Sequence, residues 1–443
     1  MGDVLVRDGR VAAIERNLSL EEADVIDARG AIVMPGFVDS HRHLWEGVIR
    51  NALPDATLVD YLVEVNGRLG TVYRPQDAYI GTLISALGAL NAGVTSILDW
   101  SHIQNTPAHT EAVIAALTES GIRAVFAYGP PSNGKGPWWL QHGHEYPQAV
   151  RQLRSSHFNS QDQRLTLAVA AAGPEIAPVE FAAQEWRVAR DIGARIAVHV
   201  GTGPMGRLGK LEAFGRTETL GPDTTYIHCS GLNAHEWQMI ADTGGSVSLS
   251  GAIEMQMGHG SPPVQAALDY GLAPSLSVDV ECSQPGDMFG QMRMAFALQR
   301  MTAHELTLAG KTAPRLMTTR DVLSWATING AVANGLASQV GRLSPGMQAD
   351  VIILRADCIN VMPLNNAYGA IVLAMDTSNV DTVIVGGQML KRGGQLLGID
   401  MQRIKRELNS SRDHVMTTAG YELSPTAATI CNKHTYASLA RPK

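Results

Sequence analysis

Residues 31–43 read AIVMPGFVDSHRH, an apolar run that ends in two histidines separated by one residue. Side chains two positions apart on a β-strand point to the same side, so His41 and His43 can face one site together. Three later apolar segments also end in side chains that bind metals, namely His199, His228 and Asp279. Strand-like segments with such residues at their C-terminal ends are typical of a parallel (β/α)8 barrel whose active site lies at that end.

The segments between these strand ends alternate in pattern. Residues 76–91 are apolar at helical spacing and stop before Gly93, and residues 94–100 then resemble a strand. The alternation continues with expected helices at 110–119 and 179–192 and expected strands at 124–128 and 165–172. Strands that alternate with helices predict βαβ units, which build a parallel sheet and an α/β fold.

The two ends of the chain differ from its middle and contain short strands and turns. Asp8-Gly9 separates two short apolar runs near the N-terminus, which is a strong sign of a β-hairpin. Short strand and turn patterns return late in the chain. We therefore predict a barrel over residues 35–337 and one small β-sandwich domain built from residues 1–34 and residues 338–443, with a C-terminal tail.

Bulk composition narrows the function. The chain has 443 residues, 45% of them hydrophobic and 17% charged, with a net charge of −7. A nucleic-acid surface should be basic, so we expect no nucleic-acid partner. No apolar stretch reaches the length of about 18 residues that a membrane-spanning helix needs, and the N-terminus lacks a signal-peptide pattern. Four scattered cysteines fit a reducing compartment. We expect a cytoplasmic protein with a small-molecule substrate and no membrane partner, and a homo-oligomer is left open.

The histidines and the aspartate suit a catalytic metal. Such a site needs a free coordination position, which a set made of His41, His43, His199 and Asp279 would leave. Taken alone, His199 would more often be a hydrogen-bonded core histidine. Because His41, His43, His228 and Asp279 also lie at predicted strand ends, a metal-binding role is favoured for it. We expect one divalent ion, zinc first, with iron, cobalt or manganese as alternatives.

Residues 33–43, with 326–331 and 341–350, resemble signature segments of the amidohydrolase superfamily. The resemblance is to the branch that holds cytosine deaminase, S-adenosylhomocysteine deaminase and the chlorotriazine hydrolases, and it covers nearly the whole chain. It implies a distorted (β/α)8 TIM barrel with a hydrolase activity. Relatives usually have a strand before the segment that resembles residues 3–14, so the chain is expected to begin late.

The resemblance also implies roles for the strand-end residues. His41 and His43 would be first-strand ligands, and His199 the fifth-strand ligand. Asp279 would be both a ligand and the catalytic base, and His228 would be the catalytic histidine that polarises water or substrate. Binuclear relatives usually carry a fourth-strand lysine, and residues 165–172 contain none, which favours one ion.

Departures from the family pattern bear on the substrate. Ring deaminases of this branch have glutamate three residues after the fifth-strand histidine, where this chain has Thr202, and Leu249 stands where many relatives have a histidine. Glu254 and His259 either supply the missing polar chemistry or are solvated or structural loop residues. The candidate substrate-contacting residues are Thr202, Glu254, His259, His102 and Trp45.

We therefore expect a metal-dependent amidohydrolase that cleaves an amide, urea, carbamate or lactam C–N bond. Deamination of a cytosine-like or guanine-like heterocycle is the alternative. Residues 201–206 fit the Gly-x-Gly-x-x-Gly pattern after a strand, but Pro204 and the mid-chain position disfavour a nucleotide-dependent oxidoreductase. A non-catalytic metal-binding barrel is a further remote alternative. The loop at 129–148, with Trp138-Trp139, is either a lid or a surface loop.

Overall fold

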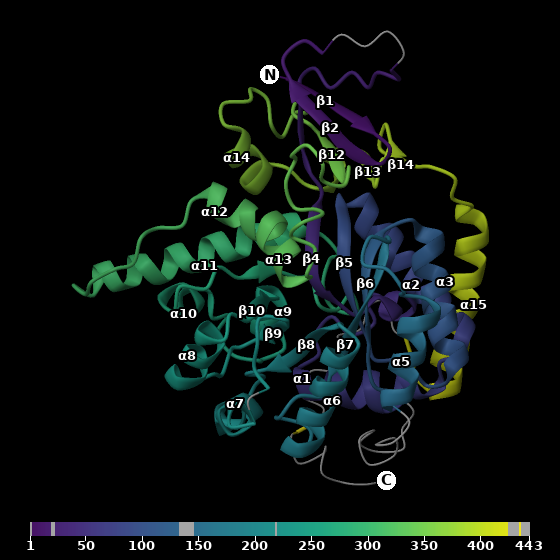
Figure 1. Cartoon of the computed structure of the whole chain (residues 1–443), viewed down its shortest axis with the longest axis vertical. Helices are drawn as coiled ribbons and strands as arrows, with labels where there is room; N and C mark the ends of the chain where they lie inside the picture. The colour runs from purple at the N-terminus through teal and green to yellow at the C-terminus, as the bar shows by residue number, and fades with distance from the viewer. Residues whose placement is uncertain (1, 19–22, 133–145, 218, 424–433, 436–443) are drawn as a thin grey trace.

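The computed structural model describes residues 2–18, 23–132, 146–217, 219–423 and 434–435. Eight parallel strands form a barrel with helices around it, and a smaller sheet lies beyond the end at which the first barrel strand begins (Figure 1). The predicted fold class is confirmed. No helix in the described part of the chain is long and apolar enough to cross a membrane.

The barrel strands neighbour one another in chain order. They are β4 (Phe37–Arg42), β5 (Val94–Ser101), β6 (Arg123–Tyr128), β7 (Leu165–Ala171), β8 (Arg195–Val200), β9 (Thr224–His228), β10 (Ser246–Leu249) and β11 (Ser275–Leu276). The last strand is shorter than the sequence predicts. The backbone at Asp279 is left-handed, with φ of 72°, so the extended conformation does not continue through it.

Helices follow the strands and cover the outside of the barrel. They are α2 (Pro75–Asn91), α3 (Pro107–Ser120), α5 (Tyr146–Ser156), α6 (Val179–Asp191), α7 (Lys210–Gly215), α8 (Ala234–Asp242), α9 (Gly251–Gln256), α10 (Val264–Asp269) and α11 (Met288–Leu308). Proline at the first position of α2 suits a helix start, and Gly93, with φ of 85°, forms the turn that leads into β5.

Shorter helical segments connect these units. They are η1 (Leu44–Ile49), α1 (Leu58–Tyr61), η2 (Leu62–Leu69), η3 (Gly70–Val72), η4 (Met205–Leu208), α12 (Thr319–Ser324), η5 (Trp325–Asn329), α13 (Gly330–Ala333), α14 (Ala367–Gly369), η6 (Ala370–Ala374) and η7 (Thr377–Asn379). The segments η1, α1 and η2 follow the first barrel strand, so they lie at the end of the barrel that carries the ligand residues.

The smaller sheet joins the two ends of the chain. Strand β3 (Ala31–Pro35) pairs antiparallel with β12 (Val351–Arg355), and the sheet continues through β13 (Val380–Val385), β14 (Gln388–Arg392) and β15 (Gln395–Leu396). The predicted hairpin is confirmed as β1 (Asp3–Arg7) and β2 (Arg10–Glu15). Apolar side chains of Val11, Val351 and Ile384 pack together between the two sheets. The exact domain boundaries stay predictions.

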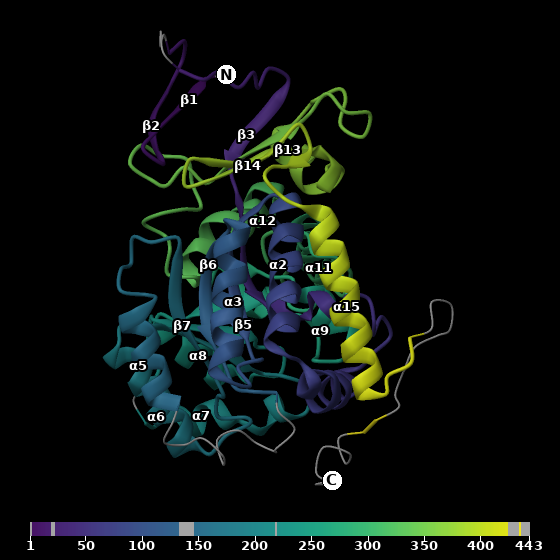
Figure 2. The same cartoon turned by 90° about the vertical axis from the view of Figure 1, so that its right-hand side faces the viewer.

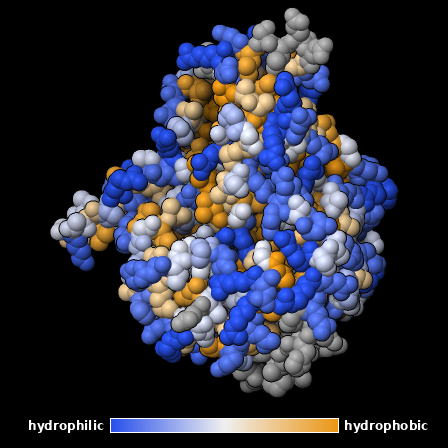
Figure 3. Space-filling view, viewed as in Figure 1, coloured by the Kyte–Doolittle hydropathy of each residue, from blue (hydrophilic) through white to orange (hydrophobic). Residues whose placement is uncertain are grey.

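The C-terminal helix returns to the barrel. Figure 2 shows α15 (Met401–Ala419) beside α2 on the outer face, and Arg68 in η2 donates to the carbonyl of Ala419 at 2.8 Å. In Figure 3, apolar residues gather between the small domain and the barrel on the face shown, while polar residues cover most of the barrel. Residues 133–145 of the predicted lid or surface loop, with Trp138-Trp139, lie outside the described residues, so that choice stays a prediction.

Candidate metal centre

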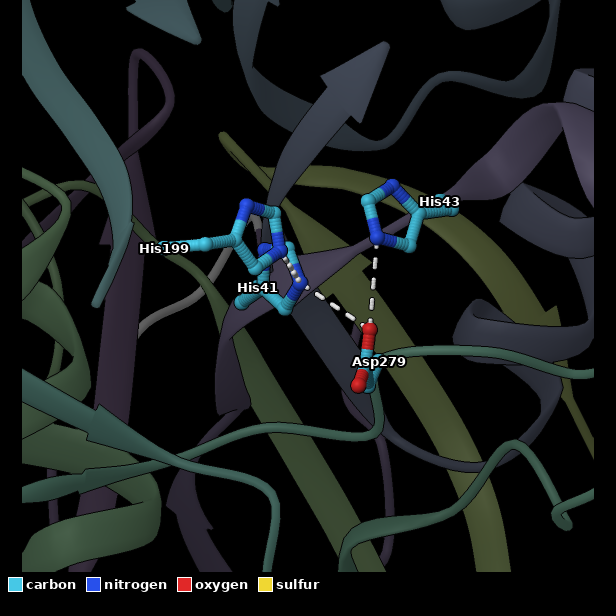
Figure 4. Close-up of side chains that lie close together, drawn as sticks. All are labelled: His41, His43, His199 and Asp279. Atoms are coloured by element: carbon cyan, nitrogen blue, oxygen red, sulfur yellow. Dashed lines mark hydrogen bonds and ion pairs between the residues drawn. The ribbon is translucent and has the colours of Figure 1, made fainter. Parts of the chain in front are cut away.

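Four side chains converge at the C-terminal ends of the barrel strands (Figure 4). His41 is the penultimate residue of β4, His43 directly follows that strand, His199 comes from β8, and Asp279 follows β11. One ligand atom of each residue lies within 4.8 Å of the others. His41 Nε2 is 3.0 Å from Asp279 Oδ1 and 3.2 Å from His199 Nε2, and His43 Nε2 is 3.3 Å from Asp279 Oδ1. The structure therefore brings the predicted ligand set together.

This arrangement fits a divalent cation. Zinc ligands at about 2.0–2.2 Å from the ion lie roughly 3–3.5 Å from one another in a five-coordinate site, close to the separations observed, and the fifth position would stay open. His43 Nδ1 lies 2.7 Å from the carbonyl oxygen of Trp100, which accepts its hydrogen and leaves Nε2 free to face the site. A shared cation would explain why the Nε2 atoms of His41 and His199 lie so close together.

The pKa shifts differ among the histidines of the cluster. Desolvation acts to lower the pKa of His43, but the hydrogen bond and charge of Asp279 outweigh it and raise that pKa. Burial lowers the pKa of His41 to about 3 and that of His199 well below its usual range, so both imidazoles are neutral, as metal ligation requires. Desolvation acts to raise the pKa of Asp279, but the nearby His41 and His43 outweigh it and hold that pKa well below its usual range. Asp279 is therefore an anion at neutral pH.

His228 lies beside these ligands and contacts a second carboxyl group. Its Nε2 is 3.7 Å from Asp279 Oδ2, and its Nδ1 is 3.2 Å from Glu254 Oε1. The backbone of His228 is left-handed, with φ of 73°, which turns the chain at the end of β9. Ser250 N donates to Glu254 Oε1 at 2.8 Å, and burial raises the pKa of Glu254 to about 8.

Glu254 and His259 are buried, so neither is a solvated loop residue. The ring of His259 meets the ring of His228 edge-on, with centroids 4.5 Å apart. Within the described residues, both ring nitrogens of His259 and Oε2 of Glu254 lack a hydrogen-bond partner. Buried polar atoms without a partner are rare in folded proteins, so these atoms point to a group that the fold alone does not provide.

The remaining predicted residues flank the cluster. Thr202 is buried, and its hydroxyl has no partner among the described residues. His102 packs behind His43 with ring centroids 4.3 Å apart, and its Nε2 contacts Asn66 Oδ1 at 2.9 Å. Trp45 donates from Nε1 to His102 Nδ1 at 3.4 Å. His102 and Trp45 therefore form a hydrogen-bonded layer behind a ligand.

The sequence reasoning missed Glu46. This side chain is fully buried on η1, three residues after His43, and accepts a 2.6 Å hydrogen bond from the Tyr61 hydroxyl on Oε1. Its Oε2 has no partner within the described residues, and burial raises its pKa to about 7. The signal in the sequence was a carboxylate one helical turn after the histidine pair, in a segment that is otherwise apolar.

Glu175, which follows β7, was also missed. It accepts hydrogen bonds from Gly201 N at 2.5 Å and from Thr202 N at 3.3 Å. These amides belong to the Gly-x-Gly-x-x-Gly segment, in which a dinucleotide site would offer amides to a phosphate. Here a carboxylate of the chain itself occupies them, and the short η4 follows in place of a long helix. This arrangement argues against the dinucleotide interpretation.

Comparisons with known proteins agree with this geometry. The model of the Amidohydrolase family matches residues 32–390. The 5'-deoxyadenosine deaminase of Methanosarcina mazei is 27% identical over 94% of each chain. The 5-methylthioadenosine/S-adenosylhomocysteine deaminase of Acetivibrio thermocellus is 26% identical, over 90% of this chain and 91% of the relative.

Solved structures share the fold. An adenosine deaminase from Xanthomonas campestris with bound zinc has a TM-score of 0.79 and 18% identity, over 94% of each chain. Atrazine chlorohydrolase TrzN from Arthrobacter aurescens TC1, complexed with zinc, has a TM-score of 0.80 and 20% identity, over 93% of this chain and 95% of that chain.

Proposed function

The chain belongs to the amidohydrolase family, and on that premise we propose that it uses water and a bound metal ion to hydrolyse a C–N bond of a small molecule. The observation that carries the proposal is the convergence of four ligand residues from three strand ends: His41, His43, His199 and Asp279. The additional catalytic histidine and the buried polar atoms beside it suit an enzyme better than a metal-binding barrel without activity.

We assign a single zinc ion to these four residues. The zinc in the two solved structures and the absence of lysine from residues 165–172 support this choice. A divalent ion in such a site supplies Lewis acidity, which lowers the pKa of a water molecule toward neutrality.

Asp279 and His228 perform the proton and charge chemistry. Asp279, ionised at neutral pH, accepts the proton of the attacking water. The carboxyl group of Glu254, with a pKa of about 8, is largely protonated at neutral pH and donates to His228 Nδ1. The hydrogen of His228 then resides on Nε2, the nitrogen that faces Asp279, and stabilises the negative charge that develops on the substrate.

Thr202 favours amide-type substrates. Ring deamination needs an acid that protonates a ring nitrogen, and a threonine hydroxyl has no accessible pKa for that transfer. The unpartnered polar atoms of Thr202 and His259 are proposed to hydrogen-bond the substrate, since a buried polar group without a partner costs about 1–3 kcal/mol that such bonds would recover. Trp45 and His102, the other two candidates, would shape the pocket from behind His43.

Deamination of a heterocycle is the second candidate. The relatives named above are deaminases of adenosine derivatives, which supports it. Glu254 and Glu46 are buried carboxyl groups with raised pKa values. Either could take the role of the deaminase glutamate, whose position is occupied by Thr202 in this chain.

A substrate panel decides between these classes. The zinc-loaded protein is expected to hydrolyse acyclic or cyclic amides, ureas or carbamates in preference to cytosine, guanine or adenosine-type compounds. The assay follows ammonia release and product mass. Deamination of a common nucleobase with kcat/KM above about 10⁴ M⁻¹s⁻¹, the lower end for established enzymes, would make deamination the better proposal and amide-type hydrolysis the second. Loss of that deamination in Glu254→Gln, with the exposed Glu180→Gln as control, would show that the deamination requires Glu254.

A further inference from the structure

Arg42 stands between two proposed ligands in the sequence, yet its side chain points away from them and is fully buried. Its guanidinium contacts two carboxylates. Nε and Nη2 lie 2.8 and 2.7 Å from Asp39 Oδ2, and Nη1 lies 2.7 Å from Glu281 Oε1. The Gly286 carbonyl accepts a further bond at 3.2 Å, and a Cβ on Gly286 would come within 2.8 Å of Glu281 Oε1, so the cluster is closely packed.

Both carboxylates are tied to the strands that hold the ligands. Asp39 belongs to β4, and its Oδ1 accepts hydrogen bonds from His41 N at 3.3 Å and from Val278 N at 3.2 Å. Glu281 follows Asp279 by two residues, on the segment that leaves β11. Arg42 therefore connects the first ligand strand with the segment that carries Asp279.

The strand pairing at this place is short, although Asn51 N and Leu53 N also donate to the carbonyls of Glu281 and Cys282 at 3.1 Å. The eight-stranded sheet has β4 at one end of its order and β11 at the other, and a single bridge between Arg42 and Asp279 closes the ring. Two hydrogen bonds accompany the bridge, from Asp279 N to His41 O at 3.0 Å and from His43 N to Asp279 O at 2.9 Å. The relative position of these ligands thus depends on a short contact that the charge cluster flanks.

A buried ion cluster often adds little net stability compared with apolar side chains, but the planar fork of arginine fixes directions. We propose that Arg42 is a positioning residue that, through Asp39 and Glu281, holds His41 and His43 at the right separation from Asp279 for metal binding. The inference rests on the proposed metal site. This role differs from metal ligation, because the guanidinium of Arg42 bonds Asp39, Glu281 and the Gly286 carbonyl and is not among the candidate ligands.

The test measures zinc binding and not activity. Single removal of Arg42 would leave the buried Asp39 carboxylate without its cation and Glu281 with Arg50 as its remaining cation, so the main variant combines Asp39→Asn, Arg42→Gln and Glu281→Gln. We expect it to fold, as judged by circular dichroism, and to bind zinc about 10- to 100-fold more weakly in competition with a chromophoric chelator. With Co²⁺ in place of zinc, the visible absorption bands should shift or weaken, because the ligand geometry changes.

Two further variants sharpen the test. Arg42→Lys keeps the charge without the fork and should also weaken zinc binding. Arg50→Gln is the matched control: its Nε bonds the other oxygen of Glu281 at 2.8 Å, but its side chain is 34% exposed, so zinc affinity should stay within about twofold.

Wild-type zinc affinity and an unchanged Co²⁺ spectrum in the folded triple variant would overturn the role of Arg42. If that variant does not fold, the same result in Arg42→Lys overturns it. A wild-type chain that binds zinc but hydrolyses no substrate would count against the proposed function alone. Equal zinc binding by the wild-type chain and the variants would count against the positioning role alone.

Discussion

We expect Asp279→Asn to lower kcat by at least about 100-fold, the usual lower scale for removal of a general base. Asparagine has nearly the same shape as aspartate, but it cannot accept the proton of the attacking water at neutral pH. The backbone tolerates the change, since asparagine, like aspartate, is enriched among residues with the left-handed φ observed at this position. The loss should therefore reflect chemistry and not folding.

The measurement is steady-state turnover of the variant in saturating zinc, with the bound metal quantified in the same sample. Asp269→Asn, an identical change at an exposed position on α10, serves as the control and should leave turnover unchanged. Turnover close to wild type in a metal-replete Asp279→Asn protein would show that Asp279 is not the base.

We expect loss of a ligand histidine to remove the metal ion together with the activity. The purified wild-type protein should contain about one divalent ion per chain, as expected for a mononuclear catalytic site. His41→Ala and His199→Ala each delete one of the four converging donors, and neither position has a spare donor among the groups of the described cluster. Both variants should lose the ion on dialysis.

Elemental analysis after dialysis measures this, with turnover recorded before and after zinc is added back. His235→Ala, on the exposed surface of α8, is the control that should retain the ion. A wild-type chain without metal, or one that needs two equivalents for full activity, would contradict the single-ion site.

The sequence predicted the barrel because the alternation of strand and helix patterns is local and periodic. It predicted the ligand set because parallel strands bring their C-terminal ends together, so residues far apart in the chain, such as His41 and Asp279, share one end of the barrel. The family resemblance added the roles. The cytoplasmic location and any homo-oligomer stay predictions.

The parts that could not be predicted depend on loop paths. Glu254 contacts His228, and Glu175 contacts Gly201, because the segments that follow different barrel strands, a helix in one case and a loop in the other, fold toward neighbouring strand ends. No periodicity in the sequence encodes those paths. The left-handed backbone at Asp279 could not be predicted either, because apolar patterning does not report a single backbone angle.

The left-handed backbone at His228 and Asp279 limits how this enzyme can evolve. Outside glycine, asparagine, aspartate and histidine are the residue types enriched in that conformation, and β-branched residues are strongly disfavoured there. At both positions, therefore, a replacement residue must adopt the left-handed φ and also provide the side chain that the proposed reaction needs. Few single mutations meet both demands, whereas the backbone at Thr202 and His259 does not have the left-handed φ and sets no such limit. New substrates are thus more accessible to mutation than a new catalytic centre.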